Sequence, residues 1–289
     1  MTVFAGQGDP RRSMDLLWRR PEAAPPGARP GPRPGLSVEV IVDAAIAVAD
    51  AEGMAALSMR AVGERLGRTA MALYTYVPGK AELVDLMYDR ALAELPAAYE
   101  VRAGWRAALV AWAEDSWAFY LRHPWMLQVS QARPVLGPNE YGVLEALLGV
   151  LAATGLDARG VRRAVATLSS VVRGAARTVA ESRQAVRATG LTEAQWWHGR
   201  AGALPEVAPG FAERFPRVAW LDAEGAPDAR DTAEAAGEAG AGSGGGSDGE
   251  AEGGVPYLEQ AAREAFEGGL ELVLDGIEAA IARTAARQG

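Results

Sequence analysis

The chain has 289 residues, of which 49% are hydrophobic, so it is long enough for one large domain or two ordinary ones. It has no cysteine and only two histidines, which excludes disulfides and thiolate zinc sites and disfavours a multi-histidine metal centre. There is no uncharged apolar run of membrane-spanning length and no secretory signal. We therefore expect a cytoplasmic protein with no membrane partner, metal or cofactor.

The net charge of −8 is concentrated in one segment. Residues 222–254 hold nine acidic residues and one arginine, a net charge of −8, so the rest of the chain is close to neutral. The rest of this segment is mostly Gly, Ala and Ser, a composition that predicts disorder. Residues 1–36 hold six arginines, three acidic residues and many prolines, which predicts a flexible arm. The acidic composition thus does not argue against an anionic partner.

Residues 37–92 are patterned as a compact helical domain. Ser37 is an expected N-cap, apolar residues then repeat at helical spacing, and Gly53 ends the first helix. Ser58 begins a second helix that ends at Gly67. A third short helix begins near Thr69, and a fourth begins at residues 79–80 and runs to about residue 92.

Residues 93–289 are interpreted as a helical bundle. Long helices are expected over residues 104–121, 141–153, 158–186 and 257–286, with an irregular stretch at 187–221 and the acidic segment as an insert. No stretch has convincing strand periodicity. The predicted fold class is all-α, with a three-helix helix-turn-helix domain followed by a helical ligand-binding and dimerisation domain.

The sequence from Leu57 to Lys80 carries the most specific pattern, L-S-M-R-A-V-G-E-R-L-G-R-T-A-M-A-L-Y-T-Y-V-P-G-K. It contains two short helices joined by a tight turn at Gly67, where glycine tolerates a backbone conformation that strains other residues. This is the helix-turn-helix pattern, in which the second helix enters a DNA major groove. It predicts double-stranded DNA as a partner.

Residues at the start of the second helix suit contacts with DNA. Thr69, Ala70 and Met71 stand where base edges are usually met. Tyr74 and Tyr76 flank the helix with hydroxyls that can donate to phosphates.

Two basic residues add to this predicted surface. Arg60 can bind a guanine edge bidentately. Lys80 is the only lysine among 29 basic residues and begins a helix, where a cation opposes the helix dipole. That position is favourable when the ammonium and the free backbone amides together hold a phosphate.

A second interpretation of this pattern stays open. Paired amphipathic helices joined at a glycine also occur in helical proteins that never bind DNA. In that case Tyr74 is a half-buried packing residue, and Arg65 and Arg68 are ordinary solvated side chains.

The stretch from Ile41 to Leu86 resembles the DNA-binding domain of the tetracycline-repressor (TetR) family of bacterial transcription regulators. The matching motifs are I-V-D-A-A-I-A-V-A-D-A-E-G, L-S-M-R-A-V-G-E-R-L-G and M-A-L-Y-T-Y-V-P-G-K-A-E-L-V-D-L-M. The resemblance implies that Arg60, Thr69, Ala70 and Met71 meet bases. It implies phosphate contacts for Ser58, Tyr74, Tyr76 and Lys80, with Thr75 beside them, and a minor-groove contact for Arg33 in the arm.

The C-terminal half resembles the same family more weakly, through W-W at 196–197, F-P at 215–216 and the closing F-E-x-G-L-E-x-x-L-D-G-I-E. In such domains, two helices pair with their copies to form a homodimer. Two apolar stripes are the candidates here, and the alternative is that both belong to the core of one chain. The predicted interface residues are Leu168, Val172, Ala175, Val179, Leu270, Val273 and Ile277.

Four tryptophans fall within residues 105–125 and point to more than one helix face, which suggests an apolar site for an unknown small-molecule effector. The alternative is that they form core and that His123 caps a helix end. By-eye alignment places Val129 where the tetracycline repressor has a metal-chelate histidine, so no metal–tetracycline complex is expected to bind. The candidate lining residues are Trp112, Ser116, Phe119, His123, Met126, Arg133, Tyr141, Arg173 and Trp196.

No nucleophile–base arrangement, phosphate loop or carboxylate cluster at metal spacing favours an enzyme. The predicted function is a DNA-binding transcriptional regulator, a repressor released from its operator by a small-molecule ligand. The alternative is a helical small-molecule-binding or interaction protein with a vestigial helix-turn-helix.

Overall fold

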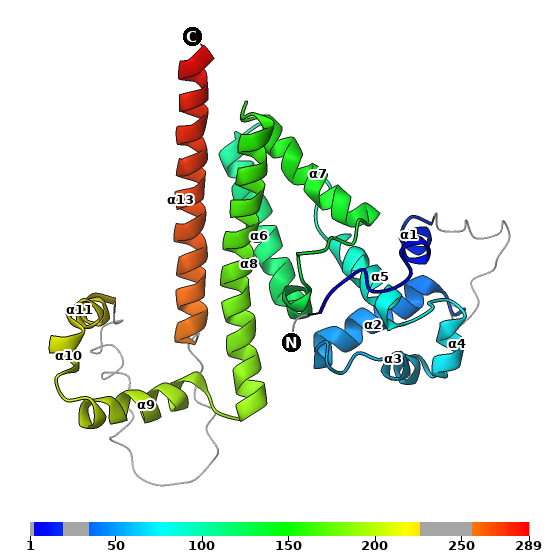
Figure 1. Cartoon of the computed structure of the whole chain (residues 1–289), viewed down its shortest axis with the longest axis horizontal. Coiled ribbons are helices and arrows are strands. Elements are labelled where there is room, and N and C mark those ends of the chain that lie inside the picture. Colours follow the sequence, from blue (N-terminus) through cyan, green and yellow to red (C-terminus); the bar gives the residue numbers. More distant parts are fainter. Residues whose placement is uncertain (1–2, 20–34, 226–255, 289) are drawn as a thin grey trace, which may run out of the picture. The chain divides into compact units, whose positions relative to one another are not determined.

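A computed structural model describes residues 3–19, 35–225 and 256–288 of the chain (Figure 1). In these ranges the regular elements are helices, and the one β-type contact is an isolated bridge between Val3 and Val129. This confirms the all-α fold class. None of the described helices is long and apolar enough to span a membrane. Two compact units are present: Met1–Glu181 with Ala261–Gly289, and Ser182–Gln260.

Residues 37–92 of the first unit form four helices, as predicted. They are α2 (Val38–Glu52), α3 (Met59–Leu66), α4 (Ala70–Tyr74) and α5 (Lys80–Leu92). The Ser37 hydroxyl caps α2 by accepting the Val40 N–H at 3.3 Å. The faces that the apolar spacing marked as inward form one buried core, which includes Ile41, Val62 and Leu83.

A second core is formed by α6 (Trp105–Arg122), α7 (Pro138–Ala152), and most of α8 (Ala158–Thr189) and α13 (Tyr257–Gln288). The 3-10 helix η1 (Pro124–Gln128) instead buries Trp125 and Met126 in the first core. The predicted long helices are thereby confirmed within a few residues. In this unit α8 and α13 lie side by side (Figure 1), and the Gly269 backbone faces the Val171 side chain.

The second unit corrects the prediction of an irregular stretch at 187–221. It contains α9 (Glu193–Val207), α10 (Phe211–Arg214) and α11 (Pro216–Gly225). Pro216 is compatible with α11 because it is the first residue of that helix, whereas Pro205 lies within α9, close to its C-terminal end. The first four residues of the acidic segment continue α11, and the others lie outside the described residues.

The N-terminal segment (residues 3–19) differs from the flexible arm predicted for residues 1–36. Asp9 caps α1 (Pro10–Leu17) by accepting the Arg12 N–H at 2.9 Å, and Pro10 occupies the first helical position, where proline is well tolerated. The Leu17 side chain is buried in the first core. Residues 20–34 of the predicted arm lie outside the described residues.

Buried carboxylates of α5 hold this segment. Asp85 accepts hydrogen bonds from the Gly6 N–H at 2.8 Å and from the Ser13 hydroxyl at 3.1 Å, and Glu82 accepts the Asp9 N–H at 3.2 Å. At its two ends the same segment contacts the second half of the unit. Val3 exchanges backbone hydrogen bonds with residues 128 and 130, and the Trp18 indole donates to the Leu136 carbonyl.

A third buried carboxylate of α5 caps α7 from across the unit. Asp89 accepts the backbone N–H groups of Asn139 and Glu140, both at 2.9 Å, and the Asn139 side-chain amide at 2.8 Å. A Cβ atom on Gly137 would lie 2.2 Å from the Asp89 carboxylate, so glycine is needed there for this approach. The helix-turn-helix domain is thereby fixed to the N-terminus of α7.

We expect Asp89→Ala to lower the free energy of unfolding by about 3 kcal/mol, because it leaves buried amide donors of the α7 N-terminus without an acceptor. Asp43→Ala is the matched control, since Asp43 pairs with Arg90 at the surface and such pairs contribute less than about 1 kcal/mol. Urea unfolding followed by circular dichroism, at one protein concentration, measures both. Equal effects of the two substitutions would contradict this role of Asp89.

Candidate functional site

The two helices α3 and α4 form a closely packed pair. The Ser58 hydroxyl accepts the Ala61 N–H at 3.1 Å at the start of α3, and Thr69 accepts the Ala72 N–H at 3.4 Å at the start of α4. Gly67 has φ +63°, the left-handed conformation that the turn was predicted to require. A Cβ atom on Gly63 would lie 2.7 Å from the Arg68 carbonyl oxygen, so the small residue permits this close packing.

Helix α4 is anchored on one side and exposed on the other. Leu73 and Val77 are fully buried, whereas Met71 is 75% exposed, Tyr74 45% and Tyr76 39%. Several large apolar or aromatic side chains exposed together mark a contact surface more often than ones scattered singly. The exposed side therefore has the shape and chemistry of a surface that inserts into a groove.

Arg60 extends into solvent from the first turn of α3. Its guanidinium pairs with Glu64 one turn later at 2.7 Å, and both side chains are mostly exposed. An exposed pair of this kind is weak, so the guanidinium can exchange Glu64 for a base edge at little cost.

Lys80 has a second role that the sequence did not indicate. Its ammonium donates to the Leu57 carbonyl oxygen at 2.6 Å and so joins the start of α5 to the start of α3. An ammonium has three donors, and the residue is exposed, so two donors are free to meet a phosphate.

The structure therefore brings the predicted DNA-contacting residues onto one motif. The exception is Arg33, which lies outside the described residues. The motif residues are Ser58, Arg60, Thr69, Ala70, Met71, Tyr74, Thr75, Tyr76 and Lys80.

The predicted effector residues separate into different regions. Trp112 and Ser116 lie in the buried part of α6, and the Trp112 indole N–H is buried without an acceptor among the described residues. Phe119 and Met126 are fully buried in the first core. The orphaned indole N–H is the one polar group of this region that calls for a further partner.

The other effector candidates have partners or lie elsewhere. Both ring nitrogens of His123 face carboxylates, and the Arg173 guanidinium donates to the Tyr120 hydroxyl at 3.1 Å and lies over its ring. Tyr141 contacts the Trp18 ring at a centroid distance of 6.2 Å. Arg133 is exposed, and Trp196 is an exposed residue of the second unit.

The predicted dimer interface requires a correction. Leu168, Val172 and Val179 of α8 are at most 1% exposed within the single chain, and they pack against Leu270 and Ile277 of α13. These residues therefore form intramolecular core, which was the alternative interpretation. Ala175 and Val273 lie partly buried beside them.

The exposed faces of the same helices carry small residues at helical spacing. On α13 this face includes Leu272, which is 75% exposed and stands among glycines and alanines. On α8 the hydroxyls of this face donate hydrogen bonds to carbonyl oxygens of their own helix. These hydroxyls therefore need no polar partner from another molecule when the face is covered. The two stripes are Thr167, Ser170, Gly174 and Thr178 on α8, and Ala265, Gly268, Leu272, Gly276 and Ala279 on α13.

The fold and the exposed two-helix motif define a helix-turn-helix DNA-binding protein. Residues 41–87 match the family model described as bacterial regulatory proteins of the tetR family, and residues 99–224 match the tetracyclin repressor-like C-terminal domain. The HTH-type transcriptional repressor DrrR1 of Streptomyces coeruleorubidus is 42% identical over 225 residues, which span 76% of this chain and 80% of that protein. The chain belongs to the TetR family of transcription regulators.

Solved structures agree with this fold. Apo ActR from Streptomyces coelicolor is 25% identical, with a TM-score of 0.58 over 86% of this chain and 99% of that one. ActR in complex with actinorhodin is 23% identical, with a TM-score of 0.61 over 86% of this chain and 97% of that one. The match to ActR extends over both the helix-turn-helix domain and the C-terminal helices.

Proposed function

We propose that the chain acts as a homodimeric repressor that a small-molecule effector releases from its operator. The observation that carries the DNA-binding part is the exposed side of α4, where Met71, Tyr74 and Tyr76 project into solvent over a fully buried anchor. Repression is favoured because the relative DrrR1 is named a transcriptional repressor.

In this proposal α4 enters the major groove of a duplex. Thr69, Ala70 and Met71 meet base edges, and the Met71 side chain suits the methyl group of a thymine. Tyr74, Tyr76, Thr75 and Ser58 approach the flanking phosphates, and Lys80 holds a phosphate at the N-terminus of α5. These residues meet one half-site only, so a second copy of the chain is needed for a palindromic operator with half-sites about 34–36 Å apart.

The second copy is best accommodated by the exposed stripes of α8 and α13. Small residues let helices approach closely, and Leu272 supplies an apolar side chain that is otherwise left in water. Exposed aromatic residues of the second unit, among them Trp196, Trp197 and Trp220, add apolar surface that a monomer would leave uncovered.

The effector site is placed at Trp112. A buried indole N–H without an acceptor is unfavourable, and an apolar ligand carrying one hydrogen-bond acceptor would satisfy it. ActR was crystallised with actinorhodin, which makes that compound a reasonable first probe for this chain. Release requires only that the effector binds more tightly, by about 1–3 kcal/mol, to a conformation in which the two α4 helices no longer fit the operator.

The experiment that tests the proposal is selection of DNA from a random duplex library by the purified chain, followed by sequencing. An enriched inverted repeat supports a specific dimeric regulator. Absence of any enriched sequence would favour the second candidate, a helical small-molecule-binding protein with a vestigial helix-turn-helix.

Lys80→Ala should weaken binding to all duplexes alike and lower the slope of log affinity against log salt concentration by about one, because it removes one phosphate contact. Arg60→Ala should instead relax the preference at one position of each half-site, at a cost of about 1–3 kcal/mol. Fluorescence anisotropy on the selected operator and on point variants of it separates the two. A change of base preference in Lys80→Ala would show that the roles are assigned wrongly.

Leu272→Arg should convert the dimer into a monomer, because it places a charge at the centre of an apolar helix face. Leu144→Arg is the matched control, since Leu144 is an exposed leucine on α7, outside the proposed interface. Size-exclusion chromatography with light scattering gives the masses. A dimeric Leu272→Arg variant would exclude this face as the interface.

Trp112→Phe should raise the effector concentration needed for half-maximal release up to about tenfold, since the ring is kept and one hydrogen bond of about 0.5–1.5 kcal/mol is lost. The readout is anisotropy of the labelled operator during titration with a panel of planar aromatic compounds that begins with actinorhodin. Val110→Ala, at an exposed position of the same helix α6, should release like wild type. Equal responses of Trp112→Phe and wild type would place the effector elsewhere.

A further inference from the structure

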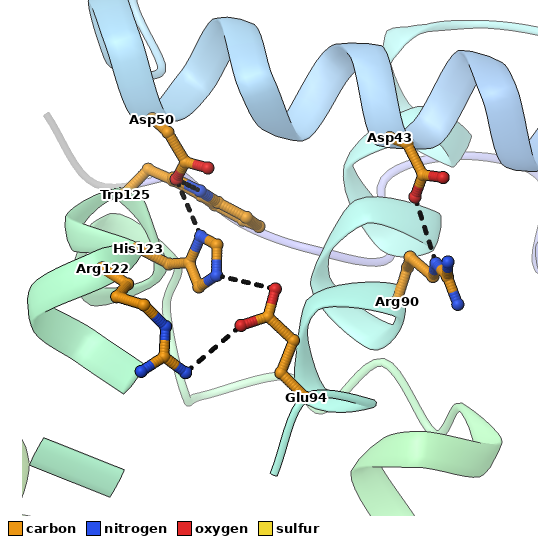
Figure 2. A network of polar contacts seen from close by, with 7 residues as sticks. All are labelled: Asp43, Asp50, Arg90, Glu94, Arg122, His123 and Trp125. Carbon is orange, nitrogen blue, oxygen red and sulfur yellow. Dashed lines mark hydrogen bonds and ion pairs between the residues drawn. The ribbon is translucent and has the colours of Figure 1, made fainter. Parts of the chain in front are cut away.

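A buried histidine joins the helix-turn-helix domain to the C-terminal helices. His123 ends α6, and Figure 2 shows its ring between two carboxylates. The Nδ1 atom lies 2.8 Å from Asp50 Oδ1 on α2, and the Nε2 atom lies 3.1 Å from Glu94 Oε1, just after α5. One side chain thus contacts both the first and the last helical segment of the DNA-binding domain.

The geometry favours a charged ring. A carboxylate oxygen only accepts hydrogen bonds, and a neutral imidazole has one N–H and one lone pair. A neutral ring would therefore turn its lone pair toward one of the two carboxylates. The imidazolium, with both nitrogens protonated, satisfies Asp50 and Glu94 together.

The surroundings support this protonation state. Asp50 also accepts the Trp125 indole N–H at 2.8 Å, and Glu94 also accepts a hydrogen bond from Arg122 at 3.2 Å (Figure 2). The two negative charges of Asp50 and Glu94 are therefore balanced by the positive charges of Arg122 and the imidazolium. A neutral ring would leave one negative charge in excess. The Phe119 ring covers the imidazole at a centroid distance of 5.2 Å, and His123 is 6% exposed.

The pKa of His123 follows from two opposing effects. Burial disfavours the charged ring, but the hydrogen bonds and charges of Asp50 and Glu94 exceed this effect and raise the pKa above its usual value. In Glu94, burial is likewise outweighed by His123 and Arg122, so the pKa of that carboxyl is lowered.

We propose that His123 is a positioning residue for operator binding. Its imidazolium holds α2 and the end of α5 in one orientation relative to α6, and loss of its proton lowers the affinity for the operator. This inference rests on the proposed function, because it concerns how the DNA-binding domain is presented. Deprotonation removes one of two charge-assisted hydrogen bonds, so the domain gains orientations that fit the operator less well.

The direction with pH is fixed by the raised pKa. The stabilisation from His123 is fully present below the ordinary histidine value of about 6.5 and is lost as the pH rises through the raised value. Affinity for the operator should therefore fall as the pH rises through the raised pKa of His123. The neighbouring Asp43–Arg90 ion pair also joins α2 to α5, at the surface.

The first test is the protonation state. The chain has two histidines, so a two-dimensional ¹H–¹⁵N spectrum of the imidazoles contains two sets of signals, and His198→Gln assigns them. Titration should give a pKa for His123 above about 6.5, with both ring nitrogens in the protonated form below it. A neutral single tautomer of His123 at pH 6.5 would overturn the proposal.

The second test is operator affinity from pH 6 to 9, measured by anisotropy with the selected duplex at constant ionic strength. Wild type and His198→Gln should lose affinity about tenfold as the pH rises through the raised pKa of His123, a modest coupling between protonation and binding. His123→Gln should bind with the weaker affinity and show no such step. Glu94→Gln keeps the ring but removes one carboxylate, so its step should move to lower pH.

The outcomes separate the two proposals. Absence of DNA binding at every pH would overturn the proposed function and this inference together. Operator binding with parallel pH profiles for wild type and His123→Gln would overturn this inference alone. Should His123→Gln fail to fold, the position of the step in Glu94→Gln decides, and an unmoved step contradicts the role of His123.

Discussion

The arrangement of the first unit depends on buried carboxylates that face backbone amides from other parts of the chain. Helix α5 carries Glu82, Asp85 and Asp89 on one buried face, and they accept N–H groups from the N-terminal segment and from the start of α7. Burial raises the pKa of Asp85 and Asp89, and the amide hydrogen bonds oppose that shift. An apolar contact would tolerate sliding, whereas these contacts fix position and direction.

This polar junction suits a regulator whose two functions lie in different parts of one unit. Operator binding needs a defined orientation of α4, and effector control needs a second orientation at a modest difference in free energy. Directional hydrogen bonds provide discrete arrangements, because a carboxylate either caps the α7 N-terminus or does not. The N-terminal segment reinforces this by contacting both α5 and residues 128–130.

Local signals in the sequence predicted the helix-turn-helix domain well. Caps at Ser37, Ser58 and Thr69 and the turn at Gly67 are decided by residues within one helical turn, and each was found where the pattern placed it. The failures have a different cause. The high proline, glycine and arginine content of residues 1–36 did not reveal that Asp9 and Pro10 begin a helix. It also could not reveal that Asp85, more than seventy residues away, would hold this segment.

The two α-helical stripes show the same limit more clearly. Periodicity in Leu168 and Val172 established that a face is buried, but a pattern cannot tell whether the covering helix belongs to the same chain or to another. In the structure, α13 of the same chain covers them. The opposite faces of the two helices consist mostly of glycine, alanine and hydroxyl residues, which give only a weak hydrophobic signal in the sequence. Leu272 falls at an unspecified position of the closing motif, and its exposure of 75% against 5% for Leu270 shows which face it occupies.

His123 illustrates how a single residue type is open to several roles until its surroundings are known. A histidine before a proline at a helix end, close to four tryptophans, could bind an effector, cap the helix or join two parts of the chain. Its two nitrogens face Asp50 and Glu94, which lie 73 and 29 residues earlier in the chain, so no local pattern contains the information. These contacts engage both ring nitrogens of His123 and connect the residue to the DNA-binding domain. In the role proposed for it, His123 therefore acts on how α4 is presented to the operator.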